Sequence, residues 1–168
     1  MMLTIPNITS VILHMEAHMS QGQRSIWFQL VTEVAVLIWF AQRFANKYAT
    51  GAFDGPEGLM ALGRMTLWTI AAFIVAMILI HILGMIAVAI ANQGEMPDDA
   101  DLTDERDRAI DAWGEKVGNV VGGLGMVLAM ILLTAGFSVA IVIAAFFITC
   151  LVGSLIGDIV KLVSYSRG

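Results

Sequence analysis

The chain has little charge for its length. Only 14% of its 168 residues are Asp, Glu, Lys or Arg, against about 25% in an ordinary soluble domain. Hydrophobic residues make up 58%, and the mean hydropathy is +0.82. So few polar residues cannot cover the surface of a soluble protein. We therefore predict an integral membrane protein whose first partner is the lipid bilayer.

Cysteine is also scarce, and motifs of known catalytic chemistry are missing from the sequence. Cys150 stands alone, so it cannot form an intramolecular disulfide, and we expect it to be a buried small hydrophobic residue. The sequence has no nucleophile elbow, Walker loop, paired-cysteine motif, HExxH or dinucleotide fingerprint. We expect neither an enzyme nor a bound cofactor. The first 25 residues lack the features of a cleaved secretory signal, and we expect them to be retained.

What the sequence does contain is long apolar tracts. About 20 apolar residues cross a ~30 Å hydrocarbon core as a helix. Residues 117–163 are too many for one helix, and Ala135–Ser138 fits a turn between two. We predict an all-α polytopic membrane protein with one transmembrane domain over residues 26–168, whose four transmembrane helices lie at about 26–45, 66–91, 117–134 and 138–163.

The N-terminal segment, residues 1–25, is predicted to contain an amphipathic helix at the membrane surface, because apolar residues recur at helical spacing in it. His14 and His18 stand four residues apart, which would place both imidazoles on one helix face. Two ligands do not complete a metal site. The spacing therefore favours a solvent-exposed polar face, with metal binding as the alternative.

Residues 92–116 hold nine acidic and three basic residues, so the acidity of the chain is local. Nucleic acid is an unsuitable partner for this much negative charge. Two interpretations stay open: a solvated connector, or a docking surface for a basic protein partner formed by Asp104, Glu105, Arg106 and Asp107.

The same residues carry a family resemblance. The sequence Asp-Glu-Arg-Asp at 104–107, followed by Ala109-Ile110 and by Gly114–Gly118, lies between two pairs of apolar tracts. It resembles a group of small predicted bacterial inner-membrane proteins of unknown function that share a DERD-type motif before the third span. The resemblance implies the two-plus-two arrangement and a location in the bacterial inner (plasma) membrane. It implies no catalytic residues.

The distribution of Lys and Arg predicts the orientation. Positive residues accumulate in the short cytoplasmic flanks of membrane helices. Three basic residues, Arg43, Lys47 and Arg64, fall on one side of the predicted membrane. The other six fall on the side of both termini, which we expect to be cytoplasmic: Arg24, Arg106, Arg108, Lys116, Lys161 and Arg167.

Glycines recur at close to helical spacing in the third and fourth spans. Small residues on one helix face let another backbone approach closely. The contact could join these two spans or two copies of the chain, and the contact within one chain is favoured. The predicted packing residues are Gly114, Gly118, Gly122, Gly125, Gly153 and Gly157.

Three ionisable residues lie within the predicted spans: Glu33, His81 and Asp158. Charged groups at membrane depth are costly and are functional candidates by default. Gln29 and Thr32 extend the polar face around Glu33. A cluster of the three could pass protons or hold a divalent cation. The alternative is structural, with each residue satisfied separately.

Two functions follow from these features. The first is a non-catalytic membrane module, an accessory or regulatory subunit that assembles through its glycine face with a protein partner or a second copy of itself. The alternative is a small oligomeric channel or transporter for protons or divalent cations, which would use Glu33, His81 and Asp158. The sequence favours the first, because its glycine and acidic features are the stronger ones.

Overall fold

The described chain forms four long helices. A computed structural model describes residues 21–91 and 105–167, and within these ranges it has no strand. Each helix is long and apolar enough to cross a membrane, which confirms the prediction of an all-α chain with four such helices. The helices are α2 (Gln21–Ala49), α3 (Gly55–Ala91), α4 (Glu105–Thr134) and α5 (Val139–Ser166).

The first three helices begin earlier than the predicted spans, whereas α5 begins at Val139, one residue after the predicted start. The sequence prediction followed only the apolar tracts, whereas polar residues at their ends continue each helix. Residues 21–25 already belong to α2, and the predicted amphipathic helix before them lies outside the described residues. In α3, Pro56 lies in the first turn, where its missing N–H costs nothing. In α4, acidic Glu105 and Asp107 lie in the first turn and suit the helix dipole.

Both tight turns are built on a glycine with a left-handed backbone. After α4, the Phe137 N–H donates to the Leu132 carbonyl, and Gly136, with φ 82°, donates to Leu133. This pattern is a Schellman motif, which favours glycine because other residues rarely adopt such a φ. Ser138 then caps α5 by accepting from the Ile141 N–H at 3.4 Å. The turn therefore lies at the residues where the sequence predicted it.

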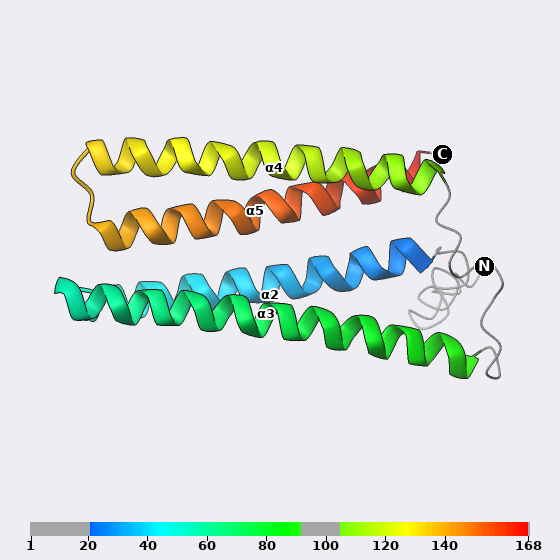
Figure 1. The fold of residues 1–168 in the computed structure, drawn as a ribbon, viewed down its shortest axis with the longest axis horizontal. Coiled ribbons are helices and arrows are strands. Elements are labelled where there is room, and N and C mark those ends of the chain that lie inside the picture. The colour runs from blue at the N-terminus through cyan, green and yellow to red at the C-terminus, as the bar shows by residue number, and fades with distance from the viewer. Residues whose placement is uncertain (1–20, 92–104, 168) are drawn as a thin grey trace, which may run out of the picture.

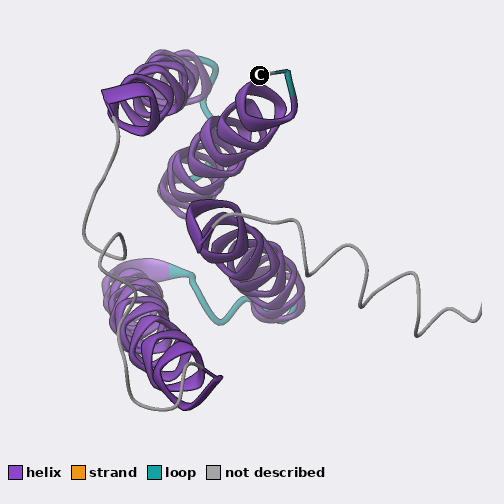
Figure 2. Ribbon diagram, turned by 90° about the vertical axis from the view of Figure 1, so that its right-hand side faces the viewer, coloured by secondary structure: helices purple, strands orange, loops and turns teal. Residues whose placement is uncertain are grey.

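The four helices form a curved row in the order α4, α5, α2, α3 (Figures 1 and 2). Neighbours in this row are antiparallel, and α5 packs against α4 on one side and α2 on the other. Along the helix axes the bundle has two ends, and at one of them α2 and α4 begin and α3 and α5 end. We call this the terminal end. The opposite end holds the turns 50–54 and 135–138 and is called the turn end.

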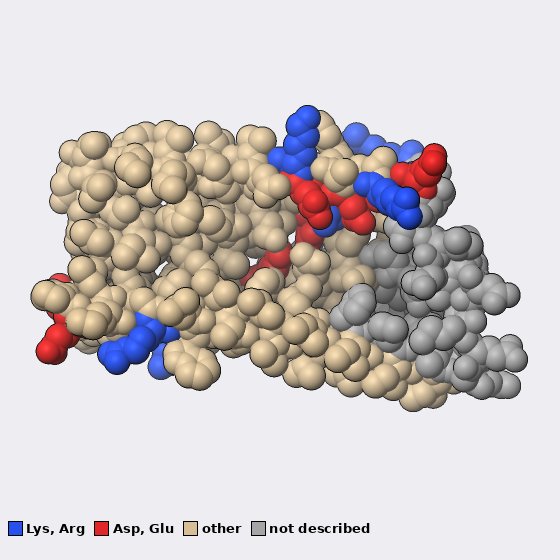
Figure 3. All heavy atoms as spheres, viewed as in Figure 1, with Lys and Arg blue, Asp and Glu red and all other residues tan. Residues whose placement is uncertain are grey.

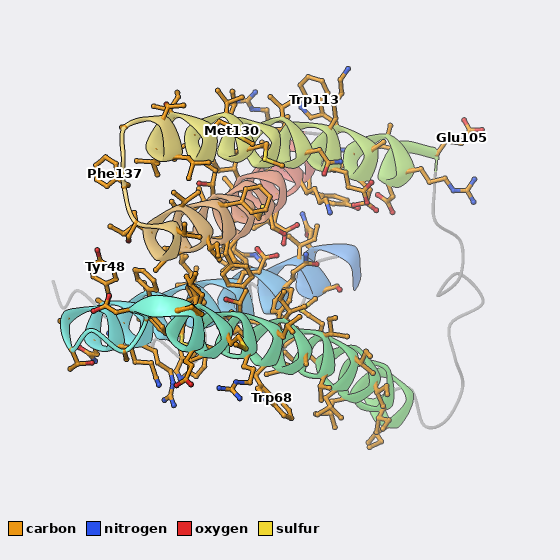
Figure 4. All side chains as sticks on the ribbon, turned by 60° about the vertical axis from the view of Figure 1, so that its left-hand side comes forward. Tyr48, Trp68, Glu105, Trp113, Met130 and Phe137 are labelled. Atoms are coloured by element: carbon orange, nitrogen blue, oxygen red, sulfur yellow. The ribbon has the colours of Figure 1, made fainter. Side chains whose placement is uncertain are left out.

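The closest-packed apolar side chains lie toward the turn end, between α2, α3 and α5. Phe40 is fully buried there, and its ring centroid lies 4.5 Å from that of Phe147. Phe44 stacks on Phe53 at 5.5 Å. Many other large apolar side chains point outward, as Trp68 and Trp113 do in Figure 4. An apolar exterior of this kind suits a lipid environment.

Candidate functional site

The α4–α5 interface is made by backbones in direct contact. A Cβ placed on Gly118 would lie 2.9 Å from the Gly153 carbonyl oxygen, and one on Gly153 would lie 2.7 Å from the Gly118 oxygen. Gly114 and Gly157 show the same reciprocal approach, at 2.8 Å each way. A Cβ on Gly125 would meet the Thr149 side chain at 2.8 Å. Only glycine fits at these positions, which fixes α4 and α5 at close range.

Gly122 differs from the other predicted packing glycines. A Cβ added to it would meet nothing within 4 Å, so its side-chain direction faces open space. The reason is helical rotation, because a residue four positions after Gly118 is turned about 40° further around the helix. A residue seven positions on, Gly125, returns to within about 20° of the contact line. The contact thus lies within one chain. Gly122 takes part in it through its backbone, since a Cβ on Gly153 would lie 3.0 Å from the Gly122 nitrogen, but its own side-chain direction points away from α5.

On its other side α5 packs antiparallel to α2 through side chains. At the turn end the Tyr48 hydroxyl lies 3.4 Å from the Ser138 hydroxyl. Phe40 then meets Phe147. Seven residues back along α2 and seven forward along α5, Glu33 meets Ser154. Two helical turns thus separate successive contacts, and the same register places Gln29 level with Asp158.

Two carboxylates are buried at this interface, Glu33 at 0% and Asp158 at 2% exposure. We call them the acidic pair. The Ser154 hydroxyl donates to Glu33 Oε1 at 2.5 Å, and the Gln29 amide donates to the same oxygen at 3.4 Å. Lys161 Nζ lies 3.4 Å from Asp158 Oδ1. The second oxygen of each carboxylate, Glu33 Oε2 and Asp158 Oδ2, is buried without a hydrogen-bond partner.

Lys161 links the acidic pair to the surface at the terminal end. Its Nζ also lies 3.9 Å from Oδ1 of Asp111 on α4, whose side chain is 48% exposed. In Figure 3, charged side chains gather on the terminal half of α4, and red atoms are visible deeper, between the two hairpins. Seven residues separate Lys161 from Ser154, so the acidic pair reaches ~10 Å below the level of Lys161.

The structure brings Glu33 and Asp158 together but does not place His81 with them. His81 lies on α3, and its side chain is outside the described part of the chain. Glu33 lies 16 residues before Ala49, and Ala71 lies 16 residues after Gly55, so these two are level in the antiparallel hairpin. His81 is ten residues further along, or ~15 Å along the axis. The sequence prediction counted the depth of each residue from the end of its apolar tract. It missed this offset because α3, with 37 residues, is longer than α2, with 29.

Sequence reasoning missed Ser154 and Lys161 as members of the site. Their spacing around Asp158, four residues before and three after, places all three on one face of α5. That pattern was the available signal. Thr32, by contrast, donates to the Phe28 carbonyl of its own helix at 2.8 Å, so it adds nothing to the acidic pair.

The other candidate residues lie apart from the acidic pair. Glu105 and Arg106 are exposed at the start of α4, and Asp107 lies beside Tyr165 of α5. His14, His18 and Asp104 lie outside the described residues. Within the described ranges, no group of three or more His, Cys, Asp or Glu side chains is arranged to hold a metal ion.

Comparison of the chain with protein-family models, with curated proteins and with solved structures finds no match. The chemistry of the site therefore has to be argued from its geometry. Two carboxylates buried near one helix interface, each with an unpaired oxygen, can accept a proton or a small cation. A neighbouring ammonium and a hydroxyl donor offset part of their charge.

Proposed function

We propose that this protein is a small multi-pass membrane protein that binds and transfers a proton or a small cation at the acidic pair. The observation that carries the proposal is the pair of buried, unpaired oxygens on Glu33 and Asp158. Burying an ionised carboxylate in a membrane is costly, and such residues commonly mark ion or proton pathways. A purely structural pair has no need of two unsatisfied oxygens.

Proton flux into reconstituted vesicles tests this proposal. Vesicles containing a pH-sensitive dye are given a K⁺ gradient and valinomycin, so that the membrane potential drives protons inward. Wild-type vesicles should acidify faster than empty ones, and Glu33→Gln and Asp158→Asn should each reduce the excess rate at least tenfold. Glu57→Gln removes an exposed carboxylate of α3 near the turn end and is the matched control. Equal rates in wild type and Glu33→Gln would contradict the proposal.

We propose as a second candidate a non-catalytic accessory or regulatory module. Two observations on α4 favour it. Glu105 and Arg106 are exposed at its start, and a shallow, open surface lies along its outer face, lined by the exposed residues Ala112, Glu115, Lys116, Asn119 and Val120. A stoichiometric larger protein that co-purifies with the wild type, and not with a charge-reversed Glu105→Lys/Arg106→Glu variant, would support this function. A homo-oligomer alone would not.

We propose that the protein lies in a bacterial inner membrane with both termini in the cytoplasm. The DERD-type resemblance supports the membrane, and the excess of Lys and Arg near the terminal end supports the orientation. Single cysteines at Asp54 and Glu105, both exposed, are introduced in a Cys150→Ala background. An impermeant thiol reagent added to intact cells should label the first and not the second. The opposite pattern would reverse the orientation.

A further inference from the structure

The acidic pair is connected to the terminal end by charged side chains and is separated from the turn end by apolar ones. Resting on the proposed function above, we propose that Glu33 and Asp158 together hold a single proton, which, in the observed arrangement of α2 and α5, they exchange only with the side of the membrane at the terminal end. The proton comes from water on that side, is bound as a carboxylic acid and returns to the same side. Movement to the other side would require a second arrangement of α2 and α5.

The number of protons follows from charge and hydrogen bonding. Two carboxylates and the Lys161 ammonium carry a net charge of −1, and one proton makes this buried group neutral. An ionised carboxylate only accepts hydrogen bonds, so the unpaired oxygens of Glu33 and Asp158 lack a donor. A proton on either carboxyl turns one of these oxygens into a hydroxyl and removes one buried negative charge. A second proton would leave the Lys161 ammonium, whose side chain is 14% exposed, without its nearest counter-ion.

A metal ion fits the same place poorly. Ca²⁺ takes six to eight oxygen ligands and Mg²⁺ a near-octahedral set. The acidic pair offers two carboxylates, and the Ser154 hydroxyl already donates its proton to Glu33. The described part of the chain contains no third acidic, His or Cys side chain grouped with them.

The direction of access follows from the exposure of successive side chains. Asp111 is 48% exposed, Lys161 is 14% and Asp158 is 3%, and Glu33 at the end of the series is fully buried. Consecutive members are linked by the ion pairs at 3.9 and 3.4 Å, and Glu33 lies within electrostatic range of Asp158 and Lys161. A continuous set of charged groups thus connects the terminal end with the acidic pair.

Toward the turn end the same interface is apolar. Between Ser154 and Ser138, α5 offers only Thr149 and Cys150 as polar side chains, and the Thr149 hydroxyl donates to its own helix at Ala145. The prediction that Cys150 is buried is wrong, because its side chain is exposed on α5. Phe40 and Phe147 close the space between α2 and α5. On α3 the buried Thr69 hydroxyl donates to the Met65 carbonyl of its own helix. In the described chain a proton at Glu33 therefore meets no buried ionisable group in that direction.

The groups that face the acidic pair come from three helices. α2 contributes Gln29, α5 contributes Ser154 and Lys161, and α4 contributes Asp111. Of the ionisable residues on α3, Glu57 and Arg64 are exposed near the turn end, and the side chain of His81 is not among those described. Lys161 is thus the cation closest to the pair in the described chain, and its ion pair with Asp111 provides a second position for its ammonium.

Infrared spectroscopy of the reconstituted protein tests both parts of the proposal. The C=O stretch of a protonated, buried carboxylic acid is resolved from that of carboxylates, and its intensity counts protons. Wild type should show one such group per chain, which disappears as pH rises. Glu33→Gln and Asp158→Asn should each remove this titrating band, whereas Ser154→Ala should keep it. Lys161→Met should move the midpoint at least one unit higher in pH, a tenfold change in proton affinity, because it removes the cation that stabilises two carboxylates.

Sidedness is measured on vesicles whose protein orientation is known from a labelled cysteine at Asp54. Raising the pH on the terminal-end side should abolish the band, and raising it on the turn-end side alone should leave it. Loss of the band with turn-end pH, or with excess Na⁺ at constant pH, would overturn the proposal. So would two titrating groups per chain or none, in samples whose melting temperature shows an intact fold. If the band is present but the vesicles show no proton flux, the proposed transport function is wrong and the proposed proton-binding site is still supported.

Discussion

The two sides of α5 differ in what they use to hold a neighbouring helix. Toward α4, the contact is made by glycines, and the backbones approach so closely that a Cβ would meet a carbonyl oxygen. Toward α2, the contact is made by side chains, aromatic at the turn end, where Phe40 meets Phe147, and polar nearer the terminal end, where Glu33 meets Ser154. The same helix thus combines a rigid interface with one whose chemistry varies along its length.

The difference shows where a small membrane protein can accommodate a buried charge. Where the backbones touch at Gly118 and Gly153 there is no space for an ionisable side chain, and only at the edge of the contact, beside Gly114, does the Lys161 side chain lie against α4. The side-chain interface provides that space, and the adjacent glycine contact brings Asp111 of α4 within reach of Lys161 on α5. Close packing of α5 against α4 therefore brings Asp111 near Lys161, which in turn pairs with Asp158.

Replacing Phe40 by Ala should be the most destabilising of three substitutions that test this comparison. Phe40 is fully buried between α2, α3 and α5, and removal of a buried Phe side chain costs about 3–5 kcal/mol. Equilibrium unfolding in mixed detergent micelles measures the loss. Phe28→Ala on the same helix is exposed and should change the free energy of unfolding by no more than about 0.5 kcal/mol. Similar effects of the two would mean that the aromatic contact does not hold α2 to α5.

Replacing Gly118 by Ala should have the next largest effect, and Gly122→Ala is its matched control one turn away. The new methyl at Gly118 lies 2.9 Å from the Gly153 oxygen, so α4 and α5 must separate, at about 1–3 kcal/mol. At Gly122 the methyl meets open space, and the higher helix propensity of Ala makes the change neutral or stabilising by up to about 1 kcal/mol. Thermal unfolding in detergent compares the two. Equal destabilisation would place the contact on a different face of α4.

Replacing Ser154 by Ala should have the smallest effect, because it removes one hydrogen bond to Glu33. Membrane hydrogen bonds contribute about 0.6 kcal/mol on average and at most about 1.7. Ser164→Ala on the same helix is the control, since that hydroxyl donates only to the Val160 carbonyl of its own turn. A double-mutant cycle with Glu33→Gln isolates the pair. A coupling energy of zero would show that Ser154 and Glu33 act independently.

The glycine interface could be predicted largely from sequence because it depends on local spacing. The recurrence of Gly114 and Gly118, and of Gly153 and Gly157, is visible without knowing which helix lies next to which. Only the outward direction of a side chain at Gly122, whose backbone lies against Gly153, needed the crossing geometry of α4 and α5. The four helices and the turn at residues 135–138 were similarly accessible, because apolar length and turn residues are local properties.

The acidic site could be predicted only in part, because it joins residues 121 positions apart in the chain. Ionisable residues at membrane depth identified Glu33 and Asp158 as candidates. Their partners depended on α2 lying beside α5 and on the register between them, which no local pattern specifies. His81 was grouped with them by depth alone, and the length of α3 places it on another level.

The order of the helices in space brings the hairpins α2–α3 and α4–α5 into contact without using the segment that joins α3 to α4. The two hairpins meet through α2 and α5, the first and last of the described helices, whereas the chain passes from α3 to α4 at the outer edges of the row. The interface that joins the hairpins is therefore made without the covalent link between Ala91 and Glu105. Two separate polypeptides, one for each hairpin, would contain every described contact between the helices, and we expect a gene split between Ala91 and Glu105 to yield two chains that assemble as a heterodimer.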